Sequence, residues 1–365
     1  MTKFGKKSQR CIELDVRQPK EGDSPGEESD CSLDEKGHID VFSWSKRRDS
    51  STHKAKDWAG QFNQISQAKD ADGIRTMRMY VQKMTIKTLN DEKYQLEDGQ
   101  KRTLSMETML QNARRTMIYQ YPMLHGEDLR VAPEDVVKVT EISVEESDCI
   151  DVCERLREQY PVGLIAVLNM ASWKNPGGGF RKGCGAQEEN LCRRSNLIDC
   201  LNNQRKKHRI APIAYPLPRF GGAISKDVCF FRGSERDGYP FRSQPLYVDV
   251  ITAAAYRLGK DDFREDGRMI LEKEIDTRKK ITAIMQMAAI NKTEHLVLSA
   301  FGCGAFNNPP DQIAQMFKAT IETYEFRSLF KTITFAIIDD HNSRGEGNVT
   351  PFKRAFNDYL KQQHF

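Results

Sequence analysis

Several features that mark common classes of protein are missing from this sequence. No run of about 18 apolar residues occurs, so no transmembrane helix and no membrane contact are expected. The first fifteen residues, MTKFGKKSQRCIELD, include no apolar segment of the kind found in secretory signals. The net charge is only +4, which gives no reason to expect direct nucleic-acid binding, although it suits an anionic ligand. We therefore expect an intracellular protein, in the cytoplasm, the nucleus or both.

Paired cysteines and metal-ligand spacings are also absent. The nine cysteines are odd in number and form no CxxC pair, which is typical of reduced thiols. No set of histidine, cysteine and carboxylate residues has the spacing of a metal site, so we predict neither a metal nor another cofactor. Cys184 lies in a glycine-rich loop, where it is either an exposed thiol or a small residue that fits a tight turn.

The N-terminal part divides into two segments by composition. Residues 1–56 are charged and serine-rich with few aliphatic residues, which predicts a disordered tail. Its last residues, SKRRDSSTHKAK, are either a nuclear address or a solvated charged stretch. Residues 57–135 predict a small, mostly helical accessory segment. We expect a helix over 75–89, a hairpin turn at Asp98-Gly99 and a helix over 105–121 that is capped by Ser105.

From residue 136 to residue 365, strand and helix patterns alternate, which predicts an α/β layered fold with a mostly parallel sheet. The predicted strands are 136–142, 163–170, 228–232, 246–252, 295–300 and 332–338. The predicted helices are 147–159 with Ser147 as its cap, 187–204, 269–291, 309–325 and 350–363. Ligands of such sheets bind beyond the carboxyl ends of the strands. Asp249, inside an apolar strand, is predicted to be a hydrogen-bonded polar residue near that site.

Two glycine loops follow predicted strands. NPGGGFRKGCGAQEE (175–189) comes after the strand 163–170, and FGCGAFNNPP (301–310) comes after the strand 295–300. In a strand–glycine loop–helix unit, backbone N–H groups and the positive end of the helix can face an anion. Two such loops at one sheet edge are expected to clamp a diphosphate. Neither loop contains Gly-Lys-Ser/Thr or GxGxxG, which argues against a nucleotide-dependent kinase or ATPase and against a dinucleotide site.

The first loop resembles the GGG-x(6–8)-QEE signature of poly(ADP-ribose) glycohydrolases, here with the spacer FRKGCGA. The segments VLNMASWKNPGGGF, VCFFRGSE, VDVITAAA and LSAFGCGAFNNPP, and the front piece YQLEDGQKRTL with ARRTMIYQY, are similar to the microbial-type branch, over about residues 60–340. The resemblance implies a macrodomain, a three-layer α/β/α sandwich. It also implies hydrolysis of the ribose–ribose O-glycosidic bond of poly(ADP-ribose), with ADP-ribose as the product. The expected partner is poly(ADP-ribose) or an ADP-ribosylated protein, and we expect a monomer.

The resemblance also implies roles for residues at matching positions. Glu189 falls on the catalytic acid and Glu188 on a residue that helps to hold the ribose. The implied ligand contacts are Asn175 to the ribose, Gly177, Gly178 and Gly179 around the diphosphate, and the loop of Gly302, Cys303, Gly304, Ala305 and Phe306 on its other side. Phe306 is either a core aromatic residue or a ring that stacks on the ligand, and Phe180 is a second, similar candidate. Gln187 is expected to cap the helix or to hold a glutamate or the loop backbone.

The chemistry of glycoside cleavage fits these residues. The reaction needs an acid for the leaving oxygen and a base for the incoming water, and one carboxyl group can serve as both in turn. Neighbouring residues on a helix point about 100° apart, so Glu188 and Glu189 are expected to have unequal roles. Capping of the helix by the two acids is the simpler alternative. Two further readings stay open: an enzyme that removes single ADP-ribose units, and a module that binds ADP-ribose without cleaving it. A side chain at Gly178 is expected to abolish binding by blocking the approach of the backbone.

Overall fold

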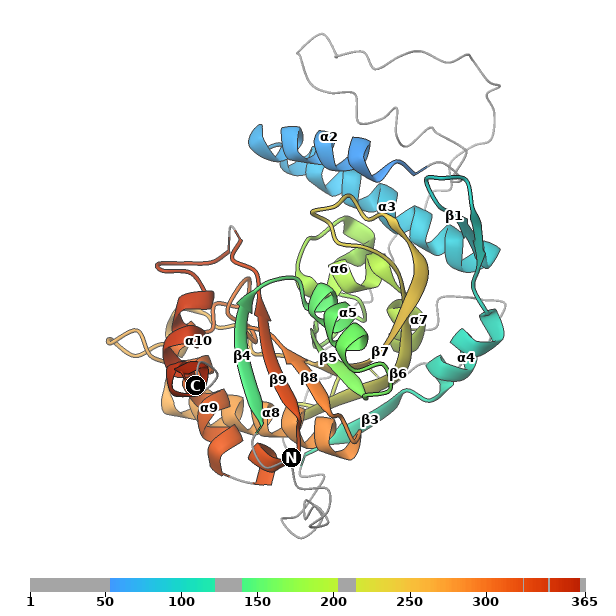
Figure 1. Cartoon of the computed structure of the whole chain (residues 1–365). Coiled ribbons are helices and arrows are strands. Elements are labelled where there is room, and N and C mark those ends of the chain that lie inside the picture. The colour runs from blue at the N-terminus through green and yellow to red at the C-terminus, as the bar shows by residue number, and fades with distance from the viewer. Residues whose placement is uncertain (1–52, 122–139, 203–214, 324, 341, 362–365) are drawn as a thin grey trace, which may run out of the picture. The chain divides into compact units, whose positions relative to one another are not determined.

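A seven-stranded sheet in the order β3-β6-β7-β5-β8-β9-β4 organises the protein in this computed structural model, which describes residues 53–121, 140–202, 215–323, 325–340 and 342–361 (Figure 1). The strands are β3 (Met117–Gln120), β6 (Gly221–Arg232), β7 (Phe241–Ala253), β5 (Ile165–Met170), β8 (His295–Leu298), β9 (Thr332–Ile337) and β4 (Glu141–Glu146). The pairs β3–β6 and β6–β7 are antiparallel, and the other neighbouring pairs are parallel. The predicted mixed, mostly parallel sheet is therefore confirmed.

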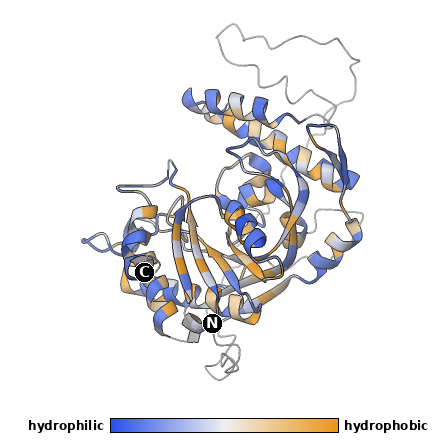
Figure 2. Ribbon diagram, in the orientation of Figure 1, coloured by the Kyte–Doolittle hydropathy of each residue, from blue (hydrophilic) through white to orange (hydrophobic). Residues whose placement is uncertain are grey.

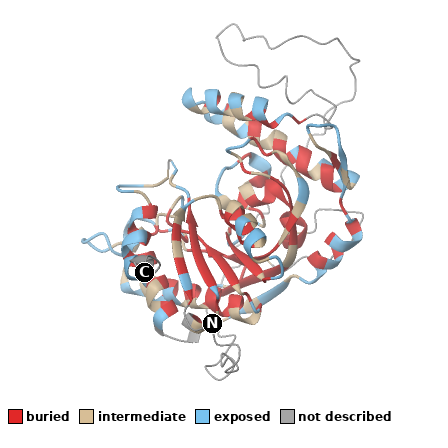
Figure 3. Ribbon diagram, in the orientation of Figure 1, coloured by how far each residue is buried: buried red, intermediate tan, exposed pale blue. Residues whose placement is uncertain are grey.

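Helices cover both faces of this sheet and make the three-layer α/β/α arrangement. One face packs against α8 (Leu271–Ile290), α9 (Pro310–Thr323), α10 (Val349–Ala355) and α11 (Asn357–Lys361). The other face packs against α4 (Met106–Arg114), α5 (Cys149–Gln159), α6 (Gln187–Arg194) and α7 (Leu197–Leu201). In β5, Ala166 and Leu168 contribute to the first core and Ile165 and Val167 to the second. β8 and β9 are buried along their whole length and β5 in all but its last residue (Figure 3), as a continuous apolar run predicts.

The described N-terminal elements all precede the predicted boundary at residue 135, although β3 joins the main sheet. They are α2 (Ala55–Gln67), α3 (Ala71–Asp91), the hairpin of β1 (Lys93–Gln95) and β2 (Lys101–Thr103), then α4 and β3. Both α2 and α3 mix apolar and polar residues (Figure 2), and Trp58 of α2 is fully buried. Ser105 caps α4 by accepting a hydrogen bond from the N–H of Thr108, as predicted. Residues 1–52 of the predicted tail lie outside the described residues, and the division at residue 135 stays a prediction.

Some predicted boundaries are wrong. The helix over 105–121 ends at Arg114, because Met117–Gln120 pairs with β6 as the edge strand β3. The strand over 136–142 is instead Glu141–Glu146, while residues 136–139 lie outside the described residues. The next helix is capped by Asp148, not Ser147, since the Asp148 carboxylate accepts the N–H groups of Ile150 and Asp151. The predicted C-terminal helix is divided into α10 and α11.

The predicted helix over 187–204 is interrupted after Arg194. Ser195 has an extended backbone and bridges to Phe230 of β6. The Ser195 hydroxyl donates to the carbonyl of Leu191, and the Asn196 side chain accepts the N–H of Cys229. Polar side chains that bond locally compete with the helix in this way. The break fixes α6 against the sheet and so fixes the position of its first turn.

The β6–β7 hairpin is much longer than the two strands that were predicted. Pro245 lies inside β7, a position that argues against a central strand. It is tolerated because β5 pairs with β7 only from Asp249 to Ala253, and no other described strand pairs with the earlier part of β7 on that side. A bulge in β6 between Ser225 and Val228 also interrupts the alternation. The sequence pattern was therefore weak where the strands are irregular.

The parallel strands place four strand ends at one edge of the sheet. The carboxyl ends of β7, β5, β8 and β9 lead into the segments 254–270, 171–186, 299–309 and 338–348. Asp249 pairs with Ala166, near the amino end of β5, so the prediction that it lies near the site is wrong. Its carboxylate is bound by Lys226, the N–H of Asp227 and Asn291. No helix within the described ranges is long and apolar enough to cross a membrane.

Candidate active site at the carboxyl edge of the sheet

The two predicted glycine loops come together because they follow neighbouring strands. β5 and β8 are parallel, with Val167 opposite Val297, so residues 171–186 and 299–309 emerge at the same edge. A third segment, after β7, supports the second loop. The N–H of Leu258 donates to the carbonyl of Phe306 at 2.9 Å, and the Asn308 amide donates to the carbonyl of Tyr256 at 2.7 Å. The expectation that both loops share one edge is confirmed.

The N–H groups of the first glycine loop do not face an open ligand site. The N–H of Gly177 donates to Glu188 Oε1 at 3.0 Å, and the N–H of Gly179 donates to Glu189 Oε1 at 2.7 Å. The N–H of Gly178 donates to the carbonyl of Asn175 at 2.8 Å. The interpretation that these three N–H groups point at a bound anion is therefore wrong for this structure. Their acceptors are protein groups, and two of them are the candidate catalytic carboxylates.

The glycines allow the loop backbone to approach these carboxylates. Gly178 has a φ of +55°, and a Cβ atom there would lie 2.4 Å from Glu189 Oε1 and 2.9 Å from Glu188 Oε2. A Cβ atom at Gly179 would lie 2.3 Å from the sulfur of Cys184, which is exposed. Only glycine avoids these overlaps. The close approach that the glycine run predicts is real, but it is to the glutamates and to the loop itself.

The two glutamates are buried and differ in their hydrogen bonds. Glu188 is 2% exposed, and its Oε2 accepts the N–H of Ser172 at 2.7 Å while its Oε1 accepts that of Gly177. Glu189 is 7% exposed, and only its Oε1 is bound by a backbone N–H. Its Oε2 is buried and has no hydrogen-bond partner among the described residues. Capping of their own helix is not what the two acids do, because they bind N–H groups of the preceding loops. Their unequal environments agree with unequal roles.

Burial raises the pKa of Glu188 to about 8, with a further contribution from the Glu189 carboxyl group. The N–H groups of Ser172 and Gly177 act in the opposite direction but do not outweigh burial. With this pKa, Glu188 is mostly protonated at neutral pH in the folded protein. The buried pair then does not carry two full negative charges side by side.

This raised pKa predicts a pH-dependent stability. Between the ordinary glutamate pKa of 4.5 and about 8, the folded protein holds a proton that the unfolded chain has released. The free energy of unfolding therefore falls as the pH rises through this window. A Glu188→Gln variant lacks this fall, so its stability relative to the parent should rise by a few kcal/mol from about pH 5 to about pH 9. Urea unfolding at several pH values measures it. Glu158→Gln, at an exposed glutamate, is the control, and identical pH profiles of parent and Glu188→Gln would contradict the prediction.

The second loop offers N–H groups that the first does not. Gly302 has a φ of +77°, and a Cβ atom there would meet the Asn308 amide at 2.5 Å. Within the described ranges, the N–H groups of Gly304, Ala305 and Phe306 have no hydrogen-bond acceptor. Ala305 is exposed and Phe306 is half-buried against the core, so the Phe306 ring keeps one accessible side. The Cys303 side chain is buried in the same core, so this residue presents only its backbone to the site. The anion-binding role predicted for this loop keeps its structural basis.

Three other predicted contacts have different outcomes. Asn175 is exposed at the start of the first loop, so its side chain is accessible to a ligand. Phe180 is only 1% exposed and packs in the core on the α6 side, so the prediction that its ring stacks on a ligand is wrong. The Gln187 side chain accepts the N–H of Met170 at 2.8 Å and donates to the carbonyl of Leu168 at 2.9 Å. Gln187 therefore joins α6 to the end of β5 and does not cap its helix.

Next to the first glycine loop lies a buried network of charged residues that the sequence did not predict. Arg78 of α3 makes two hydrogen bonds to Glu235, of 2.9 and 2.7 Å, and Glu235 also accepts from the Tyr239 hydroxyl at 2.6 Å. Arg193 of α6 is fully buried, and it donates to the Tyr239 hydroxyl and to the carbonyl of Cys184, both at 2.7 Å. The Arg193 guanidinium also lies 3.6 Å from the Glu235 carboxylate, so this arginine is a buried partner of an acidic group. The network connects α3, the β6–β7 turn and the first glycine loop.

The loop and α3 also touch directly. A Cβ atom at Gly183 would lie 2.2 Å from the backbone oxygen of Arg75, and one at Gly185 would lie 2.1 Å from the Arg78 guanidinium. Arg194, the other arginine after the glutamates, is fully buried as well, and it pairs with Asp148 of α5 at 2.8 Å. No local pattern could have signalled these partners, because Arg78 and Glu235 are 157 residues apart in the chain. The last turn of α6 is thus tied to the β6–β7 turn and to the cap of α5, and the loop before the helix is tied to α3.

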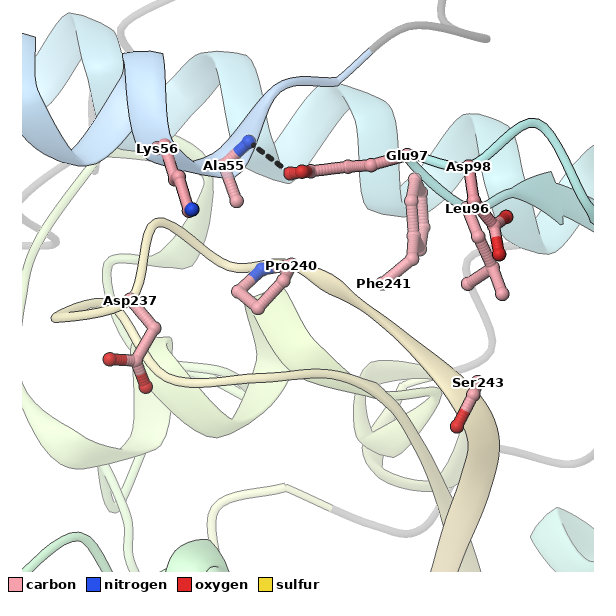
Figure 4. A pocket seen from close by; sticks show the side chains of 9 residues that line it. All are labelled: Ala55, Lys56, Leu96, Glu97, Asp98, Asp237, Pro240, Phe241 and Ser243. Atoms are coloured by element: carbon pink, nitrogen blue, oxygen red, sulfur yellow. Dashed lines mark hydrogen bonds between the residues drawn. The ribbon is translucent and has the colours of Figure 1, made fainter.

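A surface cleft elsewhere in the molecule does not suit a diphosphate. It lies between the start of α2, the β1–β2 hairpin and β7 (Figure 4). Its charged lining consists of Glu97, Asp98 and Asp237 with Lys56 as the one cation, and it includes none of the predicted site residues. An excess of carboxylates disfavours an anionic ligand. We therefore place the candidate site at the glycine loops. Within the described ranges, no group of three or more histidine, cysteine, aspartate or glutamate residues is arranged to hold a metal.

Comparisons with known proteins agree with this location. A family model described as "Microbial-type PARG, catalytic domain" matches residues 82–232, which include the first glycine loop and both glutamates. A poly(ADP-ribose) glycohydrolase from Thermomonospora curvata, solved with the inhibitor ADP-HPD, is 26% identical with a TM-score of 0.61; the match covers 76% of this chain and 99% of that one. The enzyme from Deinococcus radiodurans, solved in complex with ADP-ribose, is 30% identical with a TM-score of 0.55, over 70% of this chain and 99% of that one. A search of the curated proteins finds no match.

The match to the Deinococcus radiodurans enzyme decides the family. The two sequences are 30% identical, and the match covers 99% of that chain. The glycine loops and the paired glutamates, from which the resemblance was first drawn, lie together at one edge of the sheet. The fold agrees as well, with a TM-score of 0.55. The chain therefore belongs to the microbial-type poly(ADP-ribose) glycohydrolase family.

Proposed function

We propose that this protein hydrolyses the ribose–ribose O-glycosidic bonds of poly(ADP-ribose) and releases ADP-ribose, with Glu189 as the general acid and base. The observation that carries the assignment of Glu189 is its buried Oε2, which has no partner among the described residues while Oε1 is held by Gly179. A buried carboxyl oxygen left unpaired is costly unless a ligand completes it. Family membership supports the reaction.

The reaction needs one proton donor at the leaving oxygen. As the general acid, Glu189 donates a proton to that oxygen as the bond to the anomeric carbon breaks, and positive charge develops on the sugar. The resulting carboxylate then takes a proton from the water that attacks the anomeric carbon, which restores the acid. The products are ADP-ribose with a new anomeric hydroxyl and a polymer that is shorter by one unit. No cofactor is required for this balance.

Glu188 is the competing candidate, because its pKa of about 8 would suit an acid at neutral pH. Both of its oxygens, however, already accept backbone N–H groups, from Ser172 and Gly177. Reach to the substrate comes before pKa in assigning a general acid. We therefore assign to Glu188 the role of holding the first glycine loop at Ser172 and Gly177. By fixing this loop, Glu188 also keeps the sugar in position.

The pyrophosphate is proposed to bind between the two loops. The N–H groups of Gly304, Ala305 and Phe306 supply donors on one side, and the exposed Asn175 side chain supplies a polar contact at the first loop. The amide dipoles of such a turn suit phosphate oxygens. The accessible side of the Phe306 ring is then available to a ribose.

Release of ADP-ribose tests the function. The purified protein is incubated with poly(ADP-ribose) and, in parallel, with a mono-ADP-ribosylated protein, and free ADP-ribose is measured by chromatography. We expect release from the polymer at a rate of about 1–10³ per second, the usual range for enzymes. Release from the mono-ADP-ribosylated protein alone would favour a mono-ADP-ribosyl hydrolase. Binding of ADP-ribose without release from either substrate would identify a non-catalytic binding module and contradict the proposal.

A further inference from the structure

A group of cationic and aromatic residues lies at the same sheet edge, beyond β7. It consists of Arg219 and Phe220 before β6, Tyr256 after β7, and Lys273, Lys279 and Lys280 of α8, and we call it the α8 cation cluster. Because β6 and β7 are antiparallel with Ala223 opposite Thr252, the start of β6 and the end of β7 meet at the edge that carries the glycine loops. The cluster is therefore on the side of the site toward the outer strands.

Lys280 is the buried centre of the α8 cation cluster. It is 6% exposed, and its Nζ donates to the carbonyls of Arg219 and Ala254. Its Nζ also lies 4.5 Å from the centre of the Tyr256 ring. Within the described ranges, no carboxylate lies within ion-pair distance of it, and burial lowers its pKa to about 8. Lys280 is thus held by carbonyl oxygens and an aromatic ring, and it adds positive charge beneath the exposed members of the cluster.

The exposed cations of the cluster are held in place by aromatic rings. Arg219 has a 60% exposed side chain; it donates to the Tyr256 hydroxyl and to Asp276, and its guanidinium lies 5.3 Å from the Phe220 ring centre. Lys279 lies over the same ring at 5.1 Å. Asp276 pairs with Arg219 and Lys279, and Asp262 pairs with Lys273. Four cations thus face two paired carboxylates, and the positive charge is in excess.

A short path of contacts joins this cluster to the glutamates. The N–H of Ala171 donates to the carbonyl of Ala253, and Ala171, Leu217 and Ala254 pack together. Ser172, the next residue, donates its N–H to Glu188. The contacts therefore run from the end of β7, where the carbonyl of Ala254 accepts from Lys280, to the loop after β5, where Ser172 binds Glu188. α8 and α6 themselves cover opposite faces of the sheet, so the cluster and the glutamates meet across its carboxyl edge.

An exposed tryptophan lies on this path. Trp173 is 44% exposed, and its indole N–H donates to the carbonyl of Leu217 at 2.7 Å. The N–H of Leu217 donates back to the carbonyl of Trp173 at 3.0 Å, so the ring is held beside the segment that leads to Arg219. Lys174 lies 5.1 Å from the ring centre. An exposed, fixed indole ring beside cations is a surface on which a base can stack.

We propose that Trp173 and the α8 cation cluster form a second subsite, which binds the adenosine diphosphate part of the ADP-ribose unit that stays on the polymer. The proposal rests on the proposed function. In a ribose–ribose bond, the leaving oxygen belongs to the adenosine ribose of the retained unit. The same ribose carries an adenine and, through its 5′ carbon, a pyrophosphate. When Glu189 meets the leaving oxygen, a base and two phosphates must lie close by, which are the groups that the tryptophan and the cations suit.

Such a subsite would distinguish a polymer from a single ADP-ribose on a protein, because only the polymer has a retained nucleotide. Binding is measured by calorimetry in a Glu189→Gln background, with ADP-ribose and with the dimer of two linked ADP-ribose units as probes. We expect the dimer to bind about 10-fold more tightly than ADP-ribose, the gain from stacking one base. Trp173→Ala is expected to remove most of this gain, and Arg219→Gln to reduce it several-fold and weaken its salt dependence.

Two controls make the outcome unambiguous. Arg155→Gln removes an arginine of similar exposure, 53%, that pairs with Glu145 away from the site, and it should leave the gain unchanged. Lys280→Met keeps the volume of the buried side chain and tests the centre of the cluster. Equal affinity of dimer and ADP-ribose for the background protein, or a gain that survives both Trp173→Ala and Arg219→Gln, would overturn the subsite. Loss of ADP-ribose binding itself would instead count against the proposed function.

Discussion

A Glu189→Gln variant is expected to release ADP-ribose from poly(ADP-ribose) about 10²- to 10⁴-fold more slowly than the parent, the usual contribution of a general acid and base. Glutamine keeps the shape of the side chain and can still accept the N–H of Gly179 through its amide oxygen. It has no proton of suitable acidity to give to the leaving oxygen. ADP-ribose binding should therefore stay within a few-fold of the parent value, since binding alone needs no proton transfer.

The rate of release is measured by turnover of polymer of defined chain length, and the affinity for ADP-ribose is measured by calorimetry. Glu188→Gln is the matched comparison, because it makes the same chemical change at the neighbouring position. Both oxygens of Glu188 are occupied by loop N–H groups, so we expect a smaller loss of turnover, with a larger share in KM. A Glu189→Gln variant that turns over as fast as the parent would show that another residue is the acid.

Adding a single methyl group at Gly178 is expected to lower kcat/KM by about 10²-fold or more. The new Cβ atom would lie 2.4 Å from Glu189 Oε1 and 2.9 Å from Glu188 Oε2, so both carboxyl groups must move. A displacement of about 1 Å in a catalytic group costs on the order of 10²-fold in rate. The expected loss in Gly178→Ala thus comes from displaced carboxyl groups. This replaces the expectation that a side chain there would chiefly block the ligand's approach to the backbone.

The control for this variant is Gly267→Ala. Gly267 also has a positive φ, of +77°, but nothing lies within 4 Å of the Cβ atom that would be added. The Gly267→Ala variant therefore has the backbone strain of an alanine at positive φ, but its new Cβ atom overlaps with no other atom. We expect near-parental activity from Gly267→Ala and a modest loss of stability from both variants. Equal activities of the two variants would mean that contact with the glutamates is not what makes Gly178 necessary.

Local patterns in the sequence predicted the parts of the fold that depend on neighbours in the chain. The continuous apolar run of β5 predicted a strand buried on both faces, and Ser105 predicted the start of α4. The long β6–β7 hairpin was only partly predicted, because Pro245 and the bulge after Ser225 hide its alternation. The break after Arg194 depends on pairing with Phe230, which no window of the sequence contains.

The candidate site shows the same limit in its chemistry. The glycine run predicted that something approaches the backbone closely, but it could not tell a ligand from the Glu188 and Glu189 carboxyl groups. The aromatic residue after the run looked suitable for stacking, yet Phe180 is in the core, since orientation depends on the packing of α6 and α7. Arg78 could not be assigned because its partner, Glu235, comes from a distant hairpin.

The most direct test of the account is a crystal structure of the Glu189→Gln variant with ADP-ribose bound. It should show the pyrophosphate between residues 177–179 and the N–H groups of residues 304–306. It should also place the anomeric hydroxyl of the distal ribose within hydrogen-bond reach of residue 189, about 2.6–3.2 Å from its side chain. A pyrophosphate bound away from both glycine loops, or a distal ribose turned away from residue 189, would contradict the assignment of this carboxyl group to the cleavage of the sugar linkage.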